Sequence, residues 1–197
     1  MDARTTHASL IARLADRADE AAWREFGERY GSLLRGFALR RGLSGPEVDD
    51  IVQEVHAALL GSMPTFRYDP AKGRFRGYLK TIAVRAIQRR IFQKGRIRSL
   101  GDIDSGQVDP PAGDDAEQER EWEAEWRQYH MRRAMRTIEV EFSPLDRMAF
   151  RRYGVEGVSV AATAEELGLS VDQVYQAKSR IVRRLAELVA EQVAEEG

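Results

Sequence analysis

Cysteine is absent from the 197-residue sequence, and histidine and long apolar runs are scarce. Because the chain has no thiols, it cannot form disulfides, thiolate metal sites or cysteine nucleophiles. The three histidines, His7, His56 and His130, lie far apart and lack the spacing of a zinc site. The sequence also lacks phosphate-loop and nucleophile-elbow motifs. We therefore expect no metal, no cofactor and no catalytic residues.

No apolar run approaches the roughly 20 residues that a membrane span needs. The first ten residues contain no apolar signal core, so we expect a cytoplasmic protein that does not enter a membrane. Apolar residues make up 43% of the chain and charged residues 32%, which is typical of a globular protein with a strongly charged surface. The length suits one large domain or two small ones.

The net charge of the chain is only −1, but two neighbouring blocks are each dominated by charge of one sign. The basic block, residues 72–98, contains ten Lys or Arg residues and no acidic residue. The acidic block, residues 99–126, contains ten Asp or Glu residues and a single base, Arg120. The first pattern is typical of a polyanion-binding surface and the second of a tail or linker. A free acidic segment is expected to fold back on the basic block and screen it.

The spacing of apolar residues predicts helices nearly everywhere and no strand of useful length. Residues 99–120 are rich in Gly, Pro, Ser and Asp and contain few large apolar residues, which predicts a flexible linker. The expected fold is all-α, with two small helical domains joined by a flexible acidic linker. We place the N-terminal domain at residues 1–98, the acidic linker at 99–126 and the C-terminal domain at 127–197. For the short helix after Ser143-Pro144, the predicted buried residues are Leu145, Met148, Ala149 and Tyr153.

The C-terminal domain contains the spacing of a helix-turn-helix over residues 160–184. Ala164 lies where two helices would touch, Gly168 lies at the turn, and Val174 begins the buried face of the second helix. That second helix carries Gln, Lys and Arg residues, which can contact base edges and phosphates. A plain helical hairpin with a solvated face is the alternative. We favour DNA binding because spacing, turn residue and charged side chains agree.

Two further patterns lie in the N-terminal domain. In the basic block, cations are mixed with Phe75, Tyr78 and Phe92, a combination that suits unpaired bases. Phe75 is expected in the core, and a merely solvated basic face is the alternative. Glu47, Asp50 and Glu54 fall on one side of the preceding helix, at steps of three and four residues. Taken alone, that acidic face favours simple solvation over docking of a basic partner.

In this order, the three patterns resemble bacterial extracytoplasmic-function sigma factors, which are promoter-specificity subunits of RNA polymerase and not enzymes. The resemblance covers about residues 8–96 and 128–193. It is carried by DDIVQEV at 49–55, GRFRGYL at 73–79, SPLDR at 143–147, AEELGLS at 164–170 and VYQAKSR at 174–180. Tyr78 stands where the family often has Trp, and His56 where Phe is common.

The resemblance implies three binding surfaces. The largest catalytic subunits of core RNA polymerase would be bound by Asp49, Asp50, Gln53 and Glu54. The −10 element of promoter DNA would be bound as a single strand by Tyr78, Lys80, Arg85, Gln88, Arg89, Phe92, Lys94 and Arg96. The −35 element would be bound in the major groove by Ser170, Gln173, Gln176, Ala177, Lys178, Arg180 and Arg183. An anti-sigma factor is a common partner in the family, although no residue here identifies one.

Two other functions are weighed against this one. A dimeric helix-turn-helix repressor or activator that binds duplex operators explains residues 160–184 but gives no role to the acidic and basic helices. A nuclease needs a carboxylate cluster for its metal, and the basic block contains no carboxylate. The sequence therefore favours the sigma factor.

Overall fold

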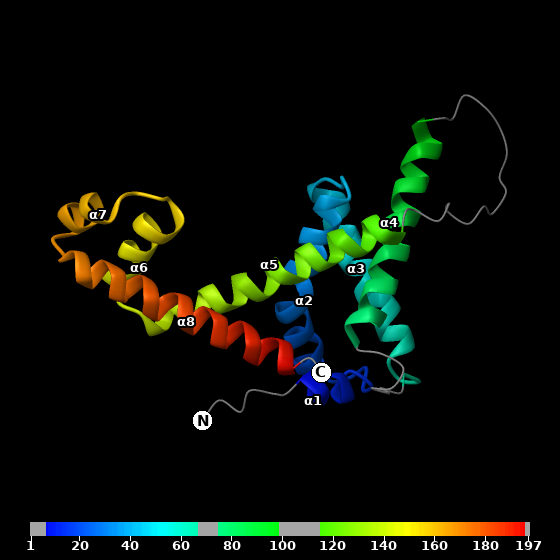
Figure 1. The fold of residues 1–197 in the computed structure, drawn as a ribbon. Helices are drawn as coiled ribbons and strands as arrows, with labels where there is room; N and C mark the ends of the chain where they lie inside the picture. The colour runs from blue at the N-terminus through cyan, green and yellow to red at the C-terminus, as the bar shows by residue number, and fades with distance from the viewer. Residues whose placement is uncertain (1–6, 67–74, 99–114, 196–197) are drawn as a thin grey trace. The chain divides into compact units, whose positions relative to one another are not determined.

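The computed structural model describes residues 7–66, 75–98 and 115–195 of the chain (Figure 1). Within these ranges the chain is almost entirely helical and forms no strand, which confirms the expected all-α class. The chain divides into two compact units. The first comprises residues 1–127 with residues 195–197, and the second comprises residues 128–194.

The first unit is built from α1 (His7–Arg13), α2 (Glu20–Arg40), α3 (Gly45–Ser62), α4 (Phe75–Arg98) and the first half of α5 (Asp115–Glu141). Asp19 caps α2 by accepting a hydrogen bond from the backbone N–H of Ala22. The chain turns after α2 at Gly42, whose φ of +79° favours glycine. At the start of α3, the Glu47 carboxylate accepts hydrogen bonds from both the backbone N–H and the hydroxyl of Ser44.

An aromatic core joins α2 to α4. Phe26, Tyr30 and Phe37 of α2 are buried, and their steps of four and seven residues place them on one face of the helix. Phe75, the first residue of α4, is also buried, and its ring meets that of Phe26 edge to face with centroids 6.3 Å apart. Burying several rings together supplies much of the apolar surface that holds a small helical unit folded.

The predicted boundary of the linker is wrong for residues 115–126, which form the first part of α5. Trp122 and Trp126 are only 1% and 6% exposed. The Trp122 ring meets Phe37 of α2 edge to face at 5.0 Å, and Trp126 stacks on Tyr30 at 6.5 Å. Two buried indoles outweigh the acidic composition of this segment, because each removes a large apolar area from water. The rest of the expected linker, residues 99–114, lies outside the described residues.

The second unit contains the remainder of α5, α6 (Pro144–Ala149), the π-helical turn η2 (Phe150–Val155), α7 (Val160–Leu167) and α8 (Val171–Glu195). Gly168 ends α7 in the left-handed conformation, with a φ of +64°. Ser170 and Gln173 cap α8 reciprocally, since each side chain accepts a hydrogen bond from the other's backbone N–H. The αL residue Gly168 therefore ends the first helix of the expected helix-turn-helix, α7, and the Ser170 cap begins the second, α8.

The core of the second unit consists of two apolar clusters. One comprises Ala134, Ile138, Ile181, Leu185 and Leu188, and the other comprises Ala149, Ala164, Val174 and Ala177. The expected burial of Leu145 and Met148 is wrong, because their exposed fractions are 43% and 49%. The six residues of α6 pass directly into η2, and Ala149 is the buried residue of this helix.

Candidate nucleic-acid and protein-binding faces

Three carboxylates on α3 pair with three cations on α4. The pairs, which we call the α3–α4 ladder, are Glu47–Lys94 at 2.9 Å, Asp50–Arg90 at 2.7 Å and Glu54–Arg89 at 2.6 Å. Most of these side chains are partly exposed, and exposed ion pairs contribute little to stability. The ladder therefore joins the two surfaces that the sequence predicts to be functional, without fixing either one permanently.

Asp49 and Gln53 complete the expected docking residues, and both are exposed on α3. The Asp49 carboxylate pairs with Arg35 of α2, and about half of each side chain is exposed. Asp49 thus carries negative charge on the surface of α3 without being part of the ladder. It is the acidic residue of this face that can be changed with least effect on α4.

Glu47 is the most strongly held of these carboxylates. Hydrogen bonds from Ser44, followed by a further one from Lys94, lower the pKa of the Glu47 carboxyl to about 2. It therefore remains ionised under all ordinary conditions and marks the fixed end of the ladder.

The expected −10 residues on α4 occupy two faces of the helix. At about 100° per residue, Tyr78, Arg85, Arg89, Phe92 and the backbone position of Arg96 fall on one line, which we call the α4 stripe. Gln88 borders this stripe. Lys80 and Lys94 fall on the other side of the helix.

Aromatic and cationic groups alternate along the α4 stripe. Tyr78 is half-buried and stacks on Phe66, with ring centroids 4.6 Å apart and an interplanar angle of 25°. Arg85 and Arg89 are exposed, and Phe92 is half-buried. A flat ring followed by cations at helical spacing can stack a base and neutralise the phosphates that follow it.

On α8, the exposed expected residues gather on one face. Gln173, Gln176, Arg180 and Arg183 are all exposed and lie on the side of α8 away from the apolar clusters. Arg180 pairs with Asp146 of α6 at 2.7 Å. These side chains are of the types that contact base edges and phosphates.

Two other expected −35 residues lie off that face. Ala177 is buried at 1% exposure in contact with the apolar cluster, so it packs the helices together and cannot contact DNA. Lys178 lies with its ammonium 4.5 Å from the centre of the Tyr153 ring. Ser170 is exposed at the start of α8 and belongs to its cap.

Sequence reasoning did not identify the contacts between α5 and α4. Glu119 pairs with Lys80, and Glu123 pairs with Arg76. The neighbouring blocks of opposite charge predict such screening, but they do not identify the partners. The spacing of the two acids, one helical turn apart, is the signal that could have indicated a helix here.

The described residues contain no group of three His, Asp or Glu side chains that could hold a metal ion. Among the same residues, no helix is long and apolar enough to cross a membrane. His56 is half-buried against Phe26, with ring centroids 5.2 Å apart, and burial lowers its pKa. It therefore behaves as a packing residue.

Residues 27–97 match the family model described as sigma-70 region 2. The match confirms the resemblance to sigma factors that the sequence predicts. The region begins within α2 and ends within α4, so it contains the whole α3–α4 ladder and the α4 stripe.

The other comparisons add little to this assignment. No curated protein matches the chain. Among solved structures, a similar chain comes from the structure of CnrH in complex with the cytosolic domain of CnrY. The two chains are 21% identical, the similarity covers 92% of this chain and 96% of the other, and the TM-score is 0.35. A similarity this low supports no argument about function. The functional proposal therefore rests on the match of residues 27–97 to the sigma-70 region 2 model.

Proposed function

We propose that this protein is a sigma factor of the extracytoplasmic-function class, which binds core RNA polymerase and directs promoter-specific initiation of transcription. The observation that carries the proposal is the sigma-70 region 2 match over residues 27–97. In that region, an exposed acidic helix lies beside a helix that carries alternating rings and cations. Neither catalysis nor a bound cofactor is needed for this role.

In this proposal the acidic surface of α3 docks on the polymerase. Asp49, Asp50, Gln53 and Glu54 present negative charge and an amide to a basic partner surface. The exposed acids of the ladder can exchange their partners on α4 for cations on the polymerase, since an exposed ion pair is easily broken. Docking then leaves the cations of α4 available to DNA.

The α4 stripe binds the −10 element as a single strand, and the exposed face of α8 binds the −35 element in the major groove. The second role is supported by the bounds of the helix-turn-helix and by Gln176, Arg180 and Arg183 on one side of α8. A recognition helix needs its base-contacting side chains on the face opposite its packing residues. Val174, Ile181 and Leu185 form that packing face.

The test is reconstituted transcription with core RNA polymerase and a library of promoter sequences, followed by sequencing of the transcript ends. We expect initiation downstream of a shared −35 and −10 pattern that is absent without this protein. Specific binding of a duplex operator by a dimer, with no effect on the polymerase, would instead support the repressor or activator.

A charge reversal tests the docking surface. Asp49→Lys should reduce co-purification with core polymerase at least tenfold, because it reverses an exposed charge at the centre of the acidic face. The fold should remain intact, since exposed substitutions usually change stability little. Glu139→Lys, at an exposed position of α5, makes the same change in net charge and should leave binding unaltered. Equal binding by all three proteins would remove α3 from the docking role.

A further inference from the structure

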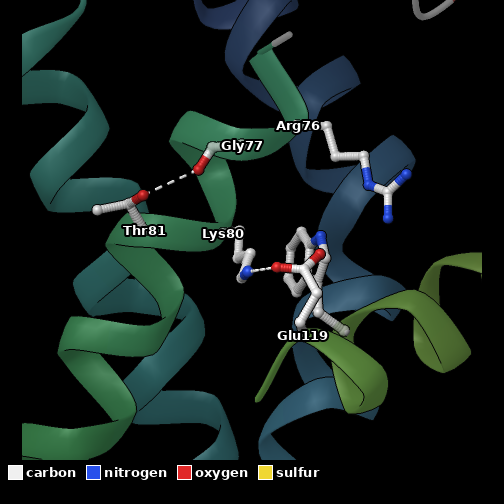
Figure 2. Close-up of a pocket in the computed structure, with 6 residues that line it drawn as sticks. Arg76, Gly77, Lys80, Thr81 and Glu119 are labelled. Carbon is white, nitrogen blue, oxygen red and sulfur yellow. Dashed lines mark hydrogen bonds and ion pairs between the residues drawn. The ribbon is translucent and has the colours of Figure 1, made fainter. Parts of the chain in front are cut away.

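A pocket of about 330 Å³ lies between the start of α4 and the start of α5 (Figure 2). It is lined by Arg76, Gly77, Lys80, Thr81, Glu119 and Trp122, all of which belong to the first unit. This pocket is separate from the α4 stripe, because Arg76 and Lys80 lie on the other side of the helix from Tyr78. Of its lining residues, Lys80 alone has an expected role so far, as a contact of the −10 element.

The cations of the pocket are held in place, whereas the acids that cover them are more exposed. Only 20% of the Arg76 side chain and 23% of the Lys80 side chain are exposed. Their partners Glu123 and Glu119 are 37% and 53% exposed. The Arg76 guanidinium also lies 4.7 Å from the centre of the Trp126 ring, which fixes it from a second side.

The polar groups of the pocket suit an anion with several oxygens. Figure 2 shows Lys80 directed at the Glu119 carboxylate, and the Thr81 hydroxyl bonded to the carbonyl oxygen of Gly77. Arginine offers a planar fork of donors and lysine a compact point charge, and a phosphate can accept from both. The hydroxyl oxygen of Thr81 can accept a hydrogen bond as well as donate one.

We propose that this pocket binds the phosphate of a nucleotide, with Glu119 and Glu123 occupying the phosphate positions until the ligand displaces them. The proposal rests on the proposed function, because a protein that handles a single strand meets phosphates at high local concentration. A volume of about 330 Å³ lies within the range of small-ligand pockets. The phosphate can belong to a single strand that crosses α4 or to a free nucleotide.

Exchange of carboxylate for phosphate has a distinct electrostatic signature. With both acids in place, two positive and two negative groups balance, and a phosphate must displace an acid to enter. Without the acids, Arg76 and Lys80 lose these two carboxylate partners and face the pocket with their positive charge. Binding of a single strand should then release further counterions, and its affinity should fall more steeply as salt rises.

The test compares two double variants of the full chain that lose the same charge. Glu119→Gln with Glu123→Gln removes the covering acids. Asp115→Asn with Glu139→Gln removes two exposed acids of the same helix, neither of which forms an ion pair with any residue that the structure describes. The probe is a fluorescein-labelled 20-nucleotide DNA single strand of random sequence, whose binding is followed by fluorescence anisotropy at several salt concentrations.

We expect the first variant to bind the strand about tenfold more tightly than the wild type at low salt. Its plot of log affinity against log salt should be steeper by about 1.4, the contribution of two phosphate contacts to a single strand. The control variant should change affinity by less than about twofold. Adding Lys80→Gln to the first variant should remove about half of the gain in slope.

A second arm distinguishes the two sources of phosphate. Adenosine and guanosine diphosphates are added as competitors of the labelled strand. Competition confined to the Glu119→Gln, Glu123→Gln variant would assign the pocket to a free nucleotide, and absence of competition beside a steeper salt dependence would assign it to the strand. Equal affinities and slopes for the two double variants, with no nucleotide binding, would overturn the proposal.

These outcomes are independent of the polymerase experiment. A protein that directs initiation but shows no difference between the two double variants retains the proposed function and loses this inference. A protein that gains affinity when the acids are removed, but directs no initiation, retains the pocket and loses the sigma-factor role. Single Glu119→Gln, at the more exposed acid, repeats the test with the smallest change to the fold.

Discussion

Gly36, in the middle of α2, lies directly against the first half of α5. A Cβ atom at this position would clash with the carboxylate of Glu125. That carboxylate is only 2% exposed and accepts a hydrogen bond from Nε of Arg40 at 2.8 Å. The close approach therefore requires glycine, and Gly36→Ala tests whether residues 115–126 pack on α2 as described.

Two opposing terms set the size of the effect. Replacing glycine by alanine inside a helix stabilises it by about 0.5–1 kcal/mol. Overpacking a tight contact costs about 1–3 kcal/mol. We expect Gly36→Ala to lower the free energy of unfolding by about 1 kcal/mol. In a Glu125→Ala background the clash disappears, and the same substitution should raise it by about 0.5–1 kcal/mol.

The assay is urea unfolding followed by tryptophan fluorescence. The three tryptophans, Trp23, Trp122 and Trp126, all lie in the first unit, so the signal reports on that unit alone. Gly31 of the same helix has no atom within 4 Å of a built Cβ. Gly31→Ala should therefore stabilise both backgrounds equally. If Gly36→Ala stabilised the wild type as Gly31→Ala does, the packing of α5 on α2 would be refuted.

Three further predictions concern the first and second units. Ser44→Ala should lower the free energy of unfolding of the first unit by about 1 kcal/mol, as loss of an N-cap does. In urea unfolding, the difference in free energy between this variant and the wild type should shrink as pH falls from about 4.5 to about 2, because Glu47 becomes protonated in that range. His56 has a lowered pKa, so the wild type should lose stability as pH falls below about 6.5, whereas His56→Phe should show a flatter pH profile by thermal unfolding. Gln176→Ala should change the preferred −35 sequence in a binding-site selection experiment, by about 1–3 kcal/mol for each lost base contact, while Val182→Ala on the same helix should leave that preference unchanged.

The helices could be predicted from sequence because their apolar residues recur at regular spacing. The rings of Phe26, Tyr30 and Phe37 occupy one side of α2, and an apolar stripe of this kind predicts a helix that buries that side. The turn at Gly168 could also be predicted from the sequence, since glycine readily adopts the left-handed conformation found there. Both features are local, and local features are encoded in short segments of sequence.

The environment of α5 could not be predicted in the same way. Its first half is rich in acids, and composition alone assigned it to a linker. Burial of Trp122 and Trp126 depends on rings more than 80 residues earlier in the chain, and Glu125 depends on the missing side chain of Gly36. Such contacts are tertiary: the four-residue step between Trp122 and Trp126 fits one face of a helix but does not show which rings cover that face.

For the charged faces, the sequence indicated which residue types gather on each helix but not which residues share a face. The basic block is recognised by its charge, and charge alone cannot separate the α4 stripe from Arg76 and Lys80 on the other side of the helix. Ala177 was assigned to DNA contact through the resemblance, although it packs against the apolar cluster around Val174. In both cases the angular position of a residue on its helix decides its role.

The α3–α4 ladder couples the free energy of ligand binding on α3 to that of ligand binding on α4. A partner that occupies Asp50 must first separate it from Arg90, and a phosphate that occupies Arg89 must first separate it from Glu54. Whatever factor one ligand contributes to the affinity of the second, the second contributes to the affinity of the first, because such coupling is reciprocal. A single strand held on α4 would therefore tighten the grip of α3 on its own partner, and release of either ligand would loosen the other.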